Sequence, residues 1–524
     1  MASVVADPSV PASAKHPKGL YVLFTTEMWE RFSYYGMRAL LVLYLTKKIG
    51  MERTDALAIY AMYTSLVYLT PMFGGFIADQ VLGQRKTIII GGIVMAMGHF
   101  AMAFPPLLYV ALGLLIVGNG FFKPNISTLV GGLYPAGDPR KDGAYTIFYM
   151  GINLGAFFSP IVCGFLGEQV SWHVGFAAAG VGMVFGLLTF WGFAKFIGPR
   201  GFPPGREVTE ESTLNPADWT HIIGVSAVSL VGVFAAIYSW PYLRPVVWAP
   251  SFAVGTVLLA FRGVILAAVI GGILMANKIF NPKKQGTVEA APLTGEEWQR
   301  MVVVVVVTLF SVLFWMGFEQ AGGTMTLFAD EKTSRSILGH EFPASLFQSI
   351  NPMFIFILAP IFSIMWTRIE RSSFKIPSIA KQGLGLILLG LGFIIMAGAE
   401  SRADSVGKVA WIWLVAVYFV HTVAELCLSP IGLSLVNKLA PPRLASLMMA
   451  VFLMSSFIGN YLAGTLEAVL KDNKVFLAAH LPAVMITASG DVSLWTFLIV
   501  TSIGPGVLLL LVTPFLNKMS HGRA

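Results

Sequence analysis

Charged residues are scarce in this chain. Asp, Glu, Lys and Arg make up 12% of its 524 residues, about half of what a soluble globular protein normally carries. Hydrophobic residues make up 56%, and the mean hydropathy is +0.74. No stretch is polar enough to cover a soluble domain, which excludes a soluble enzyme with a membrane anchor. The sequence therefore predicts an integral membrane protein.

Signatures of catalysis and of nucleotide binding are also missing. No G-x-x-x-x-G-K-[ST] sequence occurs, so a nucleotide-driven pump is not indicated. Cys163 and Cys427 lie in apolar runs without clustered histidines, so we expect buried thiols and no metal site. The eight histidines lack ligand spacing, which disfavours a membrane-embedded enzyme without excluding it. The first 18 residues lack the apolar core of a cleaved signal peptide.

Fourteen apolar runs are long enough to span a bilayer, which predicts an all-α membrane fold. They lie at about 19–46, 54–78, 86–104, 106–131, 143–166, 172–198, 218–240, 248–276, 297–329, 343–368, 376–399, 408–437, 443–469 and 492–517. An even number places both termini on one side. Of the 35 Lys and Arg residues, twenty fall on that side and ten on the other, so the positive-inside rule predicts cytoplasmic termini. The net charge of +8 thus reflects topology, not nucleic-acid binding.

The spans divide into two sets of six around an inserted pair at 218–276. Lys123-Pro124 in the first set and Ser429-Pro430 in the second are each followed, about thirty residues later, by a pattern of Asn and Gly. This weak sequence similarity between the halves agrees with a parallel repeat, in which the substrate site lies near the membrane midplane between the halves. We expect an N-terminal six-helix bundle at 1–198, a linker with two extra transmembrane helices at 199–296, and a C-terminal six-helix bundle at 297–524.

Ionisable residues inside predicted spans are the most informative feature. The first span carries a stripe at helical spacing, formed by Glu27, Glu30, Arg31, Tyr34 and Arg38. Other spans contain Lys123, Glu319 and Glu425. Seven ionised groups facing lipid would cost on the order of 18–25 kcal/mol, so we expect them to face a hydrated or paired interior. Ion pairs that only hold helices together are the alternative, although buried pairs stabilise less than apolar packing.

The signs of these charges differ between the halves. The mid-membrane bases belong to the first half, and the second half contributes the acids Glu319 and Glu425. A cavity between the halves would be bipolar, which suits an amino acid or short peptide better than a sugar, nitrate or lipophilic cation. Aromatic residues that could surround variable side chains are Tyr34, Tyr35, Tyr68, Trp315 and Phe452.

Several segments match a known family. The first is Glu27-Met-Trp-Glu30-Arg31-Phe32-Ser-Tyr34-Tyr35, and three others lie at 118–127, 148–155 and 425–433. They resemble the proton-coupled oligopeptide transporters, a branch of the major facilitator superfamily whose bacterial members contain an inserted helix pair. Gly75-x-x-x-Asp79-x-x-x-Gly83-x-Arg85 is similar to the cytoplasmic loop motif of that superfamily. The resemblance implies proton-coupled symport of di- and tripeptides by alternating access, in a bacterial inner membrane, by a monomer that is not an enzyme and needs no cofactor except the proton.

The resemblance also implies roles for individual residues. Proton coupling would involve Glu27, Glu30, Arg31, Lys123 and Glu319, with Lys123 pairing Glu30 and Glu319 forming a gate pair with Arg38. The substrate would contact Arg31, Tyr34, Tyr35, Arg38, Tyr68, Lys123, Asn153, Trp315, Asn351, Glu425, Phe452 and Ser456. Arg31 and Lys123 would attract its carboxylate, and Asn153, Asn351 and Glu425 would hold its amino end. Two features depart from the family: Phe452 replaces an expected Trp, and the second span lacks the histidine of animal members.

Charge competition suggests how coupling would work. A carboxylate beside Arg or Lys stays ionised until that partner is removed. A substrate carboxylate that binds Arg31 or Lys123 would release a Glu to take up a proton, so substrate and proton would bind together. Two alternatives stay open: a peptide-sensing receptor with a transporter fold, and another major facilitator carrier for zwitterionic solutes.

Overall fold

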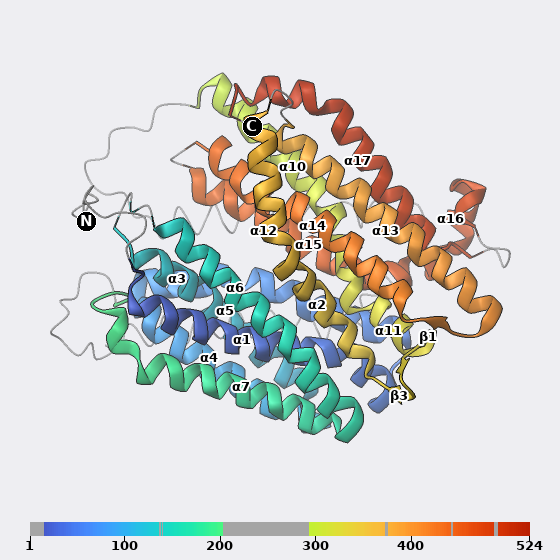
Figure 1. The fold of residues 1–524 in the computed structure, drawn as a ribbon, viewed down its shortest axis with the longest axis horizontal. Helices are drawn as coiled ribbons and strands as arrows, with labels where there is room; N and C mark the ends of the chain where they lie inside the picture. The colour runs from blue at the N-terminus through green and yellow to red at the C-terminus, as the bar shows by residue number, and fades with distance from the viewer. Residues whose placement is uncertain are drawn as a thin grey trace.

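Long helices build the described part of the molecule (Figure 1). The structure is a computed structural model that describes residues 15–135, 138, 140–202, 293–372, 376–441, 444–486 and 491–523. Within these residues, ten helical segments are long and apolar enough to cross a membrane. The predicted helix pair at 218–276, and most of the predicted linker at 199–296, lie outside the described residues.

The first group of helices precedes residue 203. It comprises α1 (Lys18–Leu43), α2 (Arg53–Leu69), α3 (Pro71–Ile77), α4 (Gly83–Ala101), α5 (Leu108–Gly132), α6 (Lys141–Ser159) and α7 (Trp172–Gly192). Short π-helical turns extend three of them: η1 (Tyr44–Lys48) follows α1, η2 (Ala78–Leu82) follows α3, and η4 (Pro160–Gly164) and η5 (Leu166–Val170) follow α6. Two 3₁₀ turns are η3 (Pro105–Leu107) and η6 (Ala194–Ile197).

The second group begins after residue 292. It comprises α10 (Gly295–Phe318), η7 (Glu319–Gly322), α11 (Thr324–Glu331), η8 (Ala344–Ser349), α12 (Ile350–Arg371), α13 (Ser378–Val406), α14 (Ile412–Leu439), α15 (Ala445–Asp472), α16 (Lys474–His480), η10 (Ala483–Met485) and α17 (Leu494–Met519). Strands β1 (Thr333–Ser334) and β4 (Val409–Ala410) pair in parallel, and β2 (Ser336–Ile337) and β3 (His340–Glu341) pair antiparallel. The predicted spans outside 218–276 fall on helices of one group or the other, although 54–78 is divided between α2 and α3, and 297–329 between α10 and α11.

Small residues let helices approach closely inside each group. A Cβ on Gly74 of α3 would lie 2.0 Å from the carbonyl oxygen of Gly120 of α5, so only glycine fits there. Gly506 of α17 is similarly placed, since its Cβ would lie 2.9 Å from the carbonyl oxygen of Gly383 in α13. The helices therefore pack backbone against backbone at these points.

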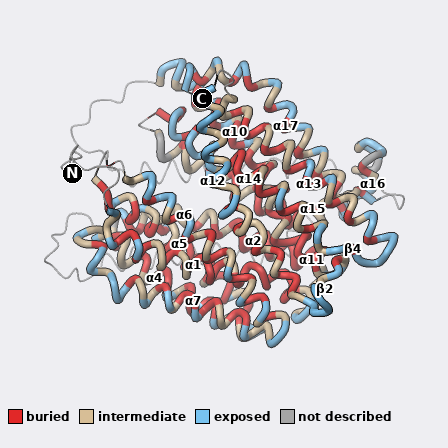
Figure 2. Tube along the Cα trace, viewed as in Figure 1, coloured by how far each residue is buried: buried red, intermediate tan, exposed pale blue. Residues whose placement is uncertain are grey.

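The outward surface of the helices is apolar. Figure 2 shows buried residues concentrated between the helices and exposed residues on their outer faces. Trp191 is 75% exposed, Leu511 73% and Phe515 65%. Faces of this kind suit lipid better than water. Cys163 and Cys427 are buried free thiols, as the sequence predicted.

Ion pairs join the two groups at one end of the molecule. This end lies far from the start of α1 and the end of α17, beyond the last residue of α1 and around the first residue of α2. Arg53 of α2 contacts Glu331 at 2.8 Å and Glu467 at 2.7 Å. Lys47 contacts Asp330 at 2.6 Å. Figure 1 shows the two groups lying close together at this end, where α11 and the strands are found.

Candidate functional site

A cavity of about 380 Å³ lies between the two groups of helices. The first group contributes Tyr35, Arg38, Tyr68, Lys123, Tyr149, Ile152, Asn153 and Ala156. Polar and aromatic lining residues of the second group include Trp315, Glu319, Gln348, Asn351, Tyr418, His421, Glu425, Ser429, Phe452 and Ser456. Both groups are needed to form the cavity, so a change in their arrangement would change access to it.

The charges around the cavity differ in sign between the groups. Arg38 and Lys123 come from the first group, whereas Glu319 and Glu425 come from the second. The sequence predicts mid-membrane bases only in the first half, but the described residues of the second group also include two buried cations, Arg300 and Lys381. Neither lines the cavity, and the Lys381 ammonium lies 4.5 Å from the centre of the Trp366 ring. The cavity itself is therefore bipolar.

Arg38 and Glu319 form an ion pair across the cavity. Both are buried, and Arg38 also donates from Nε to the hydroxyl of Tyr60 at 2.6 Å. Because Arg38 belongs to α1 and Glu319 begins η7, the pair joins the two groups. It lies on the side of the cavity that leads to the ion pairs of Arg53 and Lys47.

Lys123 has a different environment from Arg38. Its Nζ lies 4.8 Å from the centre of the Tyr68 ring. Among the described residues, no carboxylate oxygen lies within 4.0 Å of that nitrogen. A half-buried ammonium in contact with an aromatic face can still accept an anionic group of a ligand.

The second group presents a carboxylate held by amides and hydroxyls. Asn351 donates through Nδ2 to Glu425 Oε2 at 2.9 Å and to Thr422 Oγ1 at 3.1 Å. Asn153 faces the cavity from α6 and donates to the carbonyl oxygen of Tyr149 at 3.0 Å. Among the described residues Glu425 is thus hydrogen-bonded by a neutral amide, which leaves its negative charge available to a cationic group.

A second charge cluster lies behind the cavity wall. Glu30 accepts two hydrogen bonds from Arg31, one of them at 2.5 Å, and a third from Asn119 Nδ2 at 2.9 Å. Glu27 Oε1 lies 3.4 Å from Arg31 Nε, and Glu27 Oε2 has no hydrogen-bond partner among the described residues. All four side chains are buried. The cluster is compact and isolated from water.

In this structure Arg31 and Tyr34 lie away from the cavity and Lys123 does not pair with Glu30, while the substrate contacts expected of these residues stay predictions. Arg31 and Tyr34 are each 2% exposed and do not line the cavity, because Arg31 is held by the two glutamates and Tyr34 stacks on Tyr63 with ring centres 6.2 Å apart. The expected pair between Lys123 and Glu30 is also not formed, since Lys123 lies over Tyr68 and Glu30 is occupied by Arg31 and Asn119. The remaining predicted substrate residues line the cavity.

Sequence reasoning missed several polar lining residues. Tyr149, Gln348 and Tyr418 face the cavity, and Tyr60 bonds Arg38 beside it. Tyr149 lies in a segment that carried the family resemblance, which was a usable signal, whereas nothing set the other three apart from packing residues. Within the described residues, no group of three His, Cys, Asp or Glu side chains is arranged to hold a metal ion.

Comparisons with known proteins agree on one family. The model of the POT family matches residues 85–207 and 273–481. Peptide transporter YePEPT of Yersinia enterocolitica is 33% identical over 97% of this chain and 96% of that protein. An uncharacterized transporter of Bacillus subtilis, YclF, is 36% identical over 84% of this chain and 85% of that protein.

Solved structures give the same result. The crystal structure of a peptide transporter POT in complex with sulfate is 33% identical, covers 98% of both chains and has a TM-score of 0.76. A POT family transporter in complex with 5-aminolevulinic acid is 29% identical, covers 97% of this chain and 99% of that one, and has a TM-score of 0.75.

Proposed function

Because the chain belongs to the POT family, we propose that it is a proton-coupled symporter of di- and tripeptides that works by alternating access. The observation that carries this proposal is the bipolar cavity, with Lys123 on one side and the Glu425–Asn351 pair on the other. A dipeptide carries a carboxylate at one end and an ammonium at the other. Lys123 would bind the carboxylate, and Glu425 with Asn351 and Asn153 would bind the ammonium.

The architecture that goes with this function is a fourteen-helix chain. It would consist of two six-helix bundles, at 1–198 and 297–524, with the extra helix pair in the linker at 199–296. Both termini would lie in the cytoplasm of a bacterial cell, and a single chain would suffice for transport. The ion pairs of Arg53 and Lys47 would then close the outer end of the cavity.

Proton coupling would use the cluster behind the cavity wall. Protonation of Glu30 would weaken its hold on Arg31, which could then turn toward the cavity beside Lys123. A substrate carboxylate would stabilise that position of Arg31, so each binding event would favour the other. Protonation of Glu319 would release Arg38 and so loosen the outer closure. In this scheme Glu30 and Glu319 take up the protons, and Arg31 and Arg38 are the charges that are released.

Dialanine uptake tests the proposal. Proteoliposomes with an inward proton gradient should accumulate labelled dialanine, and unlabelled dipeptides should compete with it. N-acetylated dipeptides should compete poorly, because Glu425 would lose its cationic partner. Specific binding without uptake would instead indicate a peptide-sensing receptor, and equal competition by N-acetylated peptides would contradict the role of Glu425.

A carrier for another zwitterionic solute is the second candidate. It is favoured by the related transporter whose crystal structure holds 5-aminolevulinic acid. That molecule shares a carboxylate and an amine with a dipeptide but lacks the peptide bond. Competition between 5-aminolevulinic acid and labelled dialanine separates the two candidates, since a peptide transporter should prefer dialanine.

A further inference from the structure

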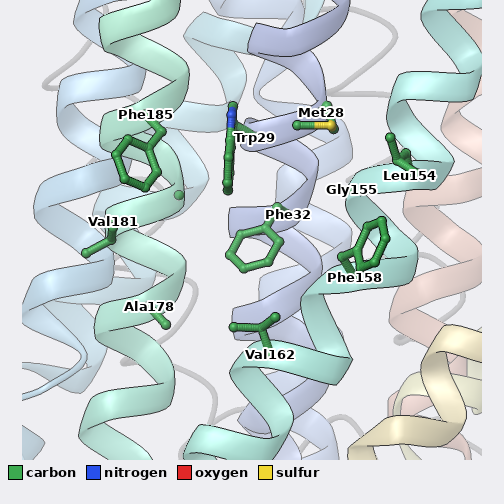
Figure 3. Close-up of a pocket in the computed structure, with 11 residues that line it drawn as sticks. Met28, Trp29, Phe32, Leu154, Gly155, Phe158, Val162, Ala178, Val181 and Phe185 are labelled. Atoms are coloured by element: carbon green, nitrogen blue, oxygen red, sulfur yellow. The ribbon is translucent and has the colours of Figure 1, made fainter.

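We propose that a groove on the outside of the first group of helices binds the acyl chain of an anionic phospholipid from the leaflet on the side of the chain ends. The groove has a volume of about 510 Å³ and lies apart from the transport cavity. Figure 3 shows α1 as its floor, with α6 and α7 as its walls. Its lining is apolar: Met28, Trp29, Phe32, Leu154, Gly155, Phe158, Val162, Ala178, Val181, Gly182 and Phe185.

The groove arises from the way in which α6 and α7 pack on α1. A Cβ on Gly155 of α6 would lie 2.2 Å from the carbonyl oxygen of Met28, and one on Gly182 of α7 would lie 2.6 Å from Phe32 Cδ1. Both helices thus contact α1 closely. At the end far from the chain termini α7 also packs against η4 and η5, but α6 and α7, both fully described, share no extensive contact. The two walls therefore separate toward the side of the termini.

The walls of the groove face the bilayer. Phe158 and Phe185 are each 46% exposed, and Val181 is 44% exposed. In a chain that crosses the membrane, such side chains contact hydrocarbon, and a lining whose one polar side-chain group is the indole N–H of Trp29 offers little to a solute from water. A flexible acyl chain can enter between the separating walls and pack on Trp29 and Phe32.

Two lysines supply charge complementarity at the open side. The Nζ atoms of Lys18 and Lys195 lie 5.5 and 5.3 Å from the centre of the same ring, Phe196. Both lysines are exposed. Ten residues of helix separate Lys18 from Met28, which is about 15 Å and matches half of the roughly 30 Å hydrocarbon thickness. A phosphate at these lysines therefore places the end of its acyl chain in the groove, which favours an anionic lipid over a second copy of this chain.

Photo-crosslinking in vesicles tests this directly. The full chain is reconstituted with a trace of phosphatidylglycerol that carries a diazirine near the end of its acyl chain, and labelled peptides are mapped by mass spectrometry. Phosphatidylcholine with the same chain is the comparison lipid. We expect label from phosphatidylglycerol to concentrate in 28–32 and 178–185 and to exceed that from phosphatidylcholine. Even labelling around the whole helix surface, or crosslinks between two copies of the chain, would overturn the proposal.

Three variants sharpen the result. Val181→Trp fills the groove and should reduce labelling there several-fold, whereas Leu511→Trp, at a 73% exposed position of α17 in the second group of helices, should not. Lys18→Gln with Lys195→Gln, both at exposed positions, should lower phosphatidylglycerol labelling by roughly fivefold for each lysine and leave phosphatidylcholine labelling unchanged. Unaltered labelling in Val181→Trp, or an equal loss for both lipids in the lysine variant, would contradict the proposal. Neither result depends on peptide transport.

Discussion

Glu30 and Glu425 are both carboxylates within the membrane, yet their surroundings are opposite. Glu30 is 0% exposed and is bonded by Arg31 and Asn119 within the first group of helices. Glu425 lines the cavity and is bonded by the amide of Asn351. A carboxylate that already has a cationic partner responds to the loss of that partner, whereas one bonded only by neutral groups can bind a cation from outside. We therefore propose that Glu30, in the first group, serves proton coupling and that Glu425, in the second group, binds the amino end of the peptide.

The largest effect is expected from Glu30→Gln. The amide keeps the shape and can still bond Asn119, but it cannot ionise, so it cannot exchange a proton during the cycle. Uptake of dialanine driven by a proton gradient should be abolished, while counterflow exchange between equal peptide pools should persist. Glu331→Gln, which removes a 50% exposed carboxylate at the closed end, is the matched control. Normal gradient-driven accumulation in Glu30→Gln would remove this residue from the coupling.

Glu425→Gln should have a smaller effect of a different kind. Loss of a hydrogen bond between charged groups costs about 1.5–3 kcal/mol, which corresponds to a roughly 10- to 150-fold rise in KM for free dipeptides. N-acetylated dipeptides, which we expect to bind weakly to the unaltered protein, should show little change. Uptake and counterflow should be affected equally, because the substitution alters binding and not proton exchange. A variant that loses gradient-driven uptake but keeps its KM in counterflow would reverse the two assignments.

The smallest effect is expected from Lys47→Gln. The Lys47 side chain is 44% exposed in its pair with Asp330, and exposed pairs contribute about 0.2–1 kcal/mol. The equilibrium between the two states of the cavity should shift by less than about fivefold, which can be measured as a small change in counterflow KM. Asp330→Asn should give a larger shift, because it also removes the 3.1 Å contact of Asp330 with Arg335, and adding Lys47→Gln to it should change little further. A loss of transport in Lys47→Gln would show that the pair does more than hold the closed end.

The sequence predicts part of this arrangement because the membrane makes buried charge costly. The stripe on α1 is buried as expected, and the predicted spans outside 218–276 lie on helices, with ten described segments long and apolar enough to cross a membrane. Helical spacing identifies the face on which Arg31 and Tyr34 lie, but not how deep that face is covered by neighbouring helices. Both residues consequently lie behind the cavity wall, where neighbouring glutamates or rings occupy them.

Partners chosen by geometry are harder to predict than burial. Lys123 contacts Tyr68 instead of Glu30, because Arg31 and Asn119 already occupy that carboxylate. Tyr60 bonds Arg38, yet no charge or motif distinguishes it from the tyrosines that pack. Competition between several donors for one acceptor depends on distances that only the folded helices define.

Electrogenic accumulation tests the central claim most directly. A dipeptide with neutral side chains has no net charge, so each proton that moves with it carries one positive charge inward. One charge across 100 mV corresponds to about 2.3 kcal/mol, which supports roughly fifty-fold accumulation for a single proton. Proteoliposomes with an inside-negative potential should therefore concentrate dialanine above the external level, and collapse of both the potential and the pH gradient should abolish the excess but not exchange. Accumulation that does not change with the potential, at a fixed pH gradient, would contradict electrogenic symport.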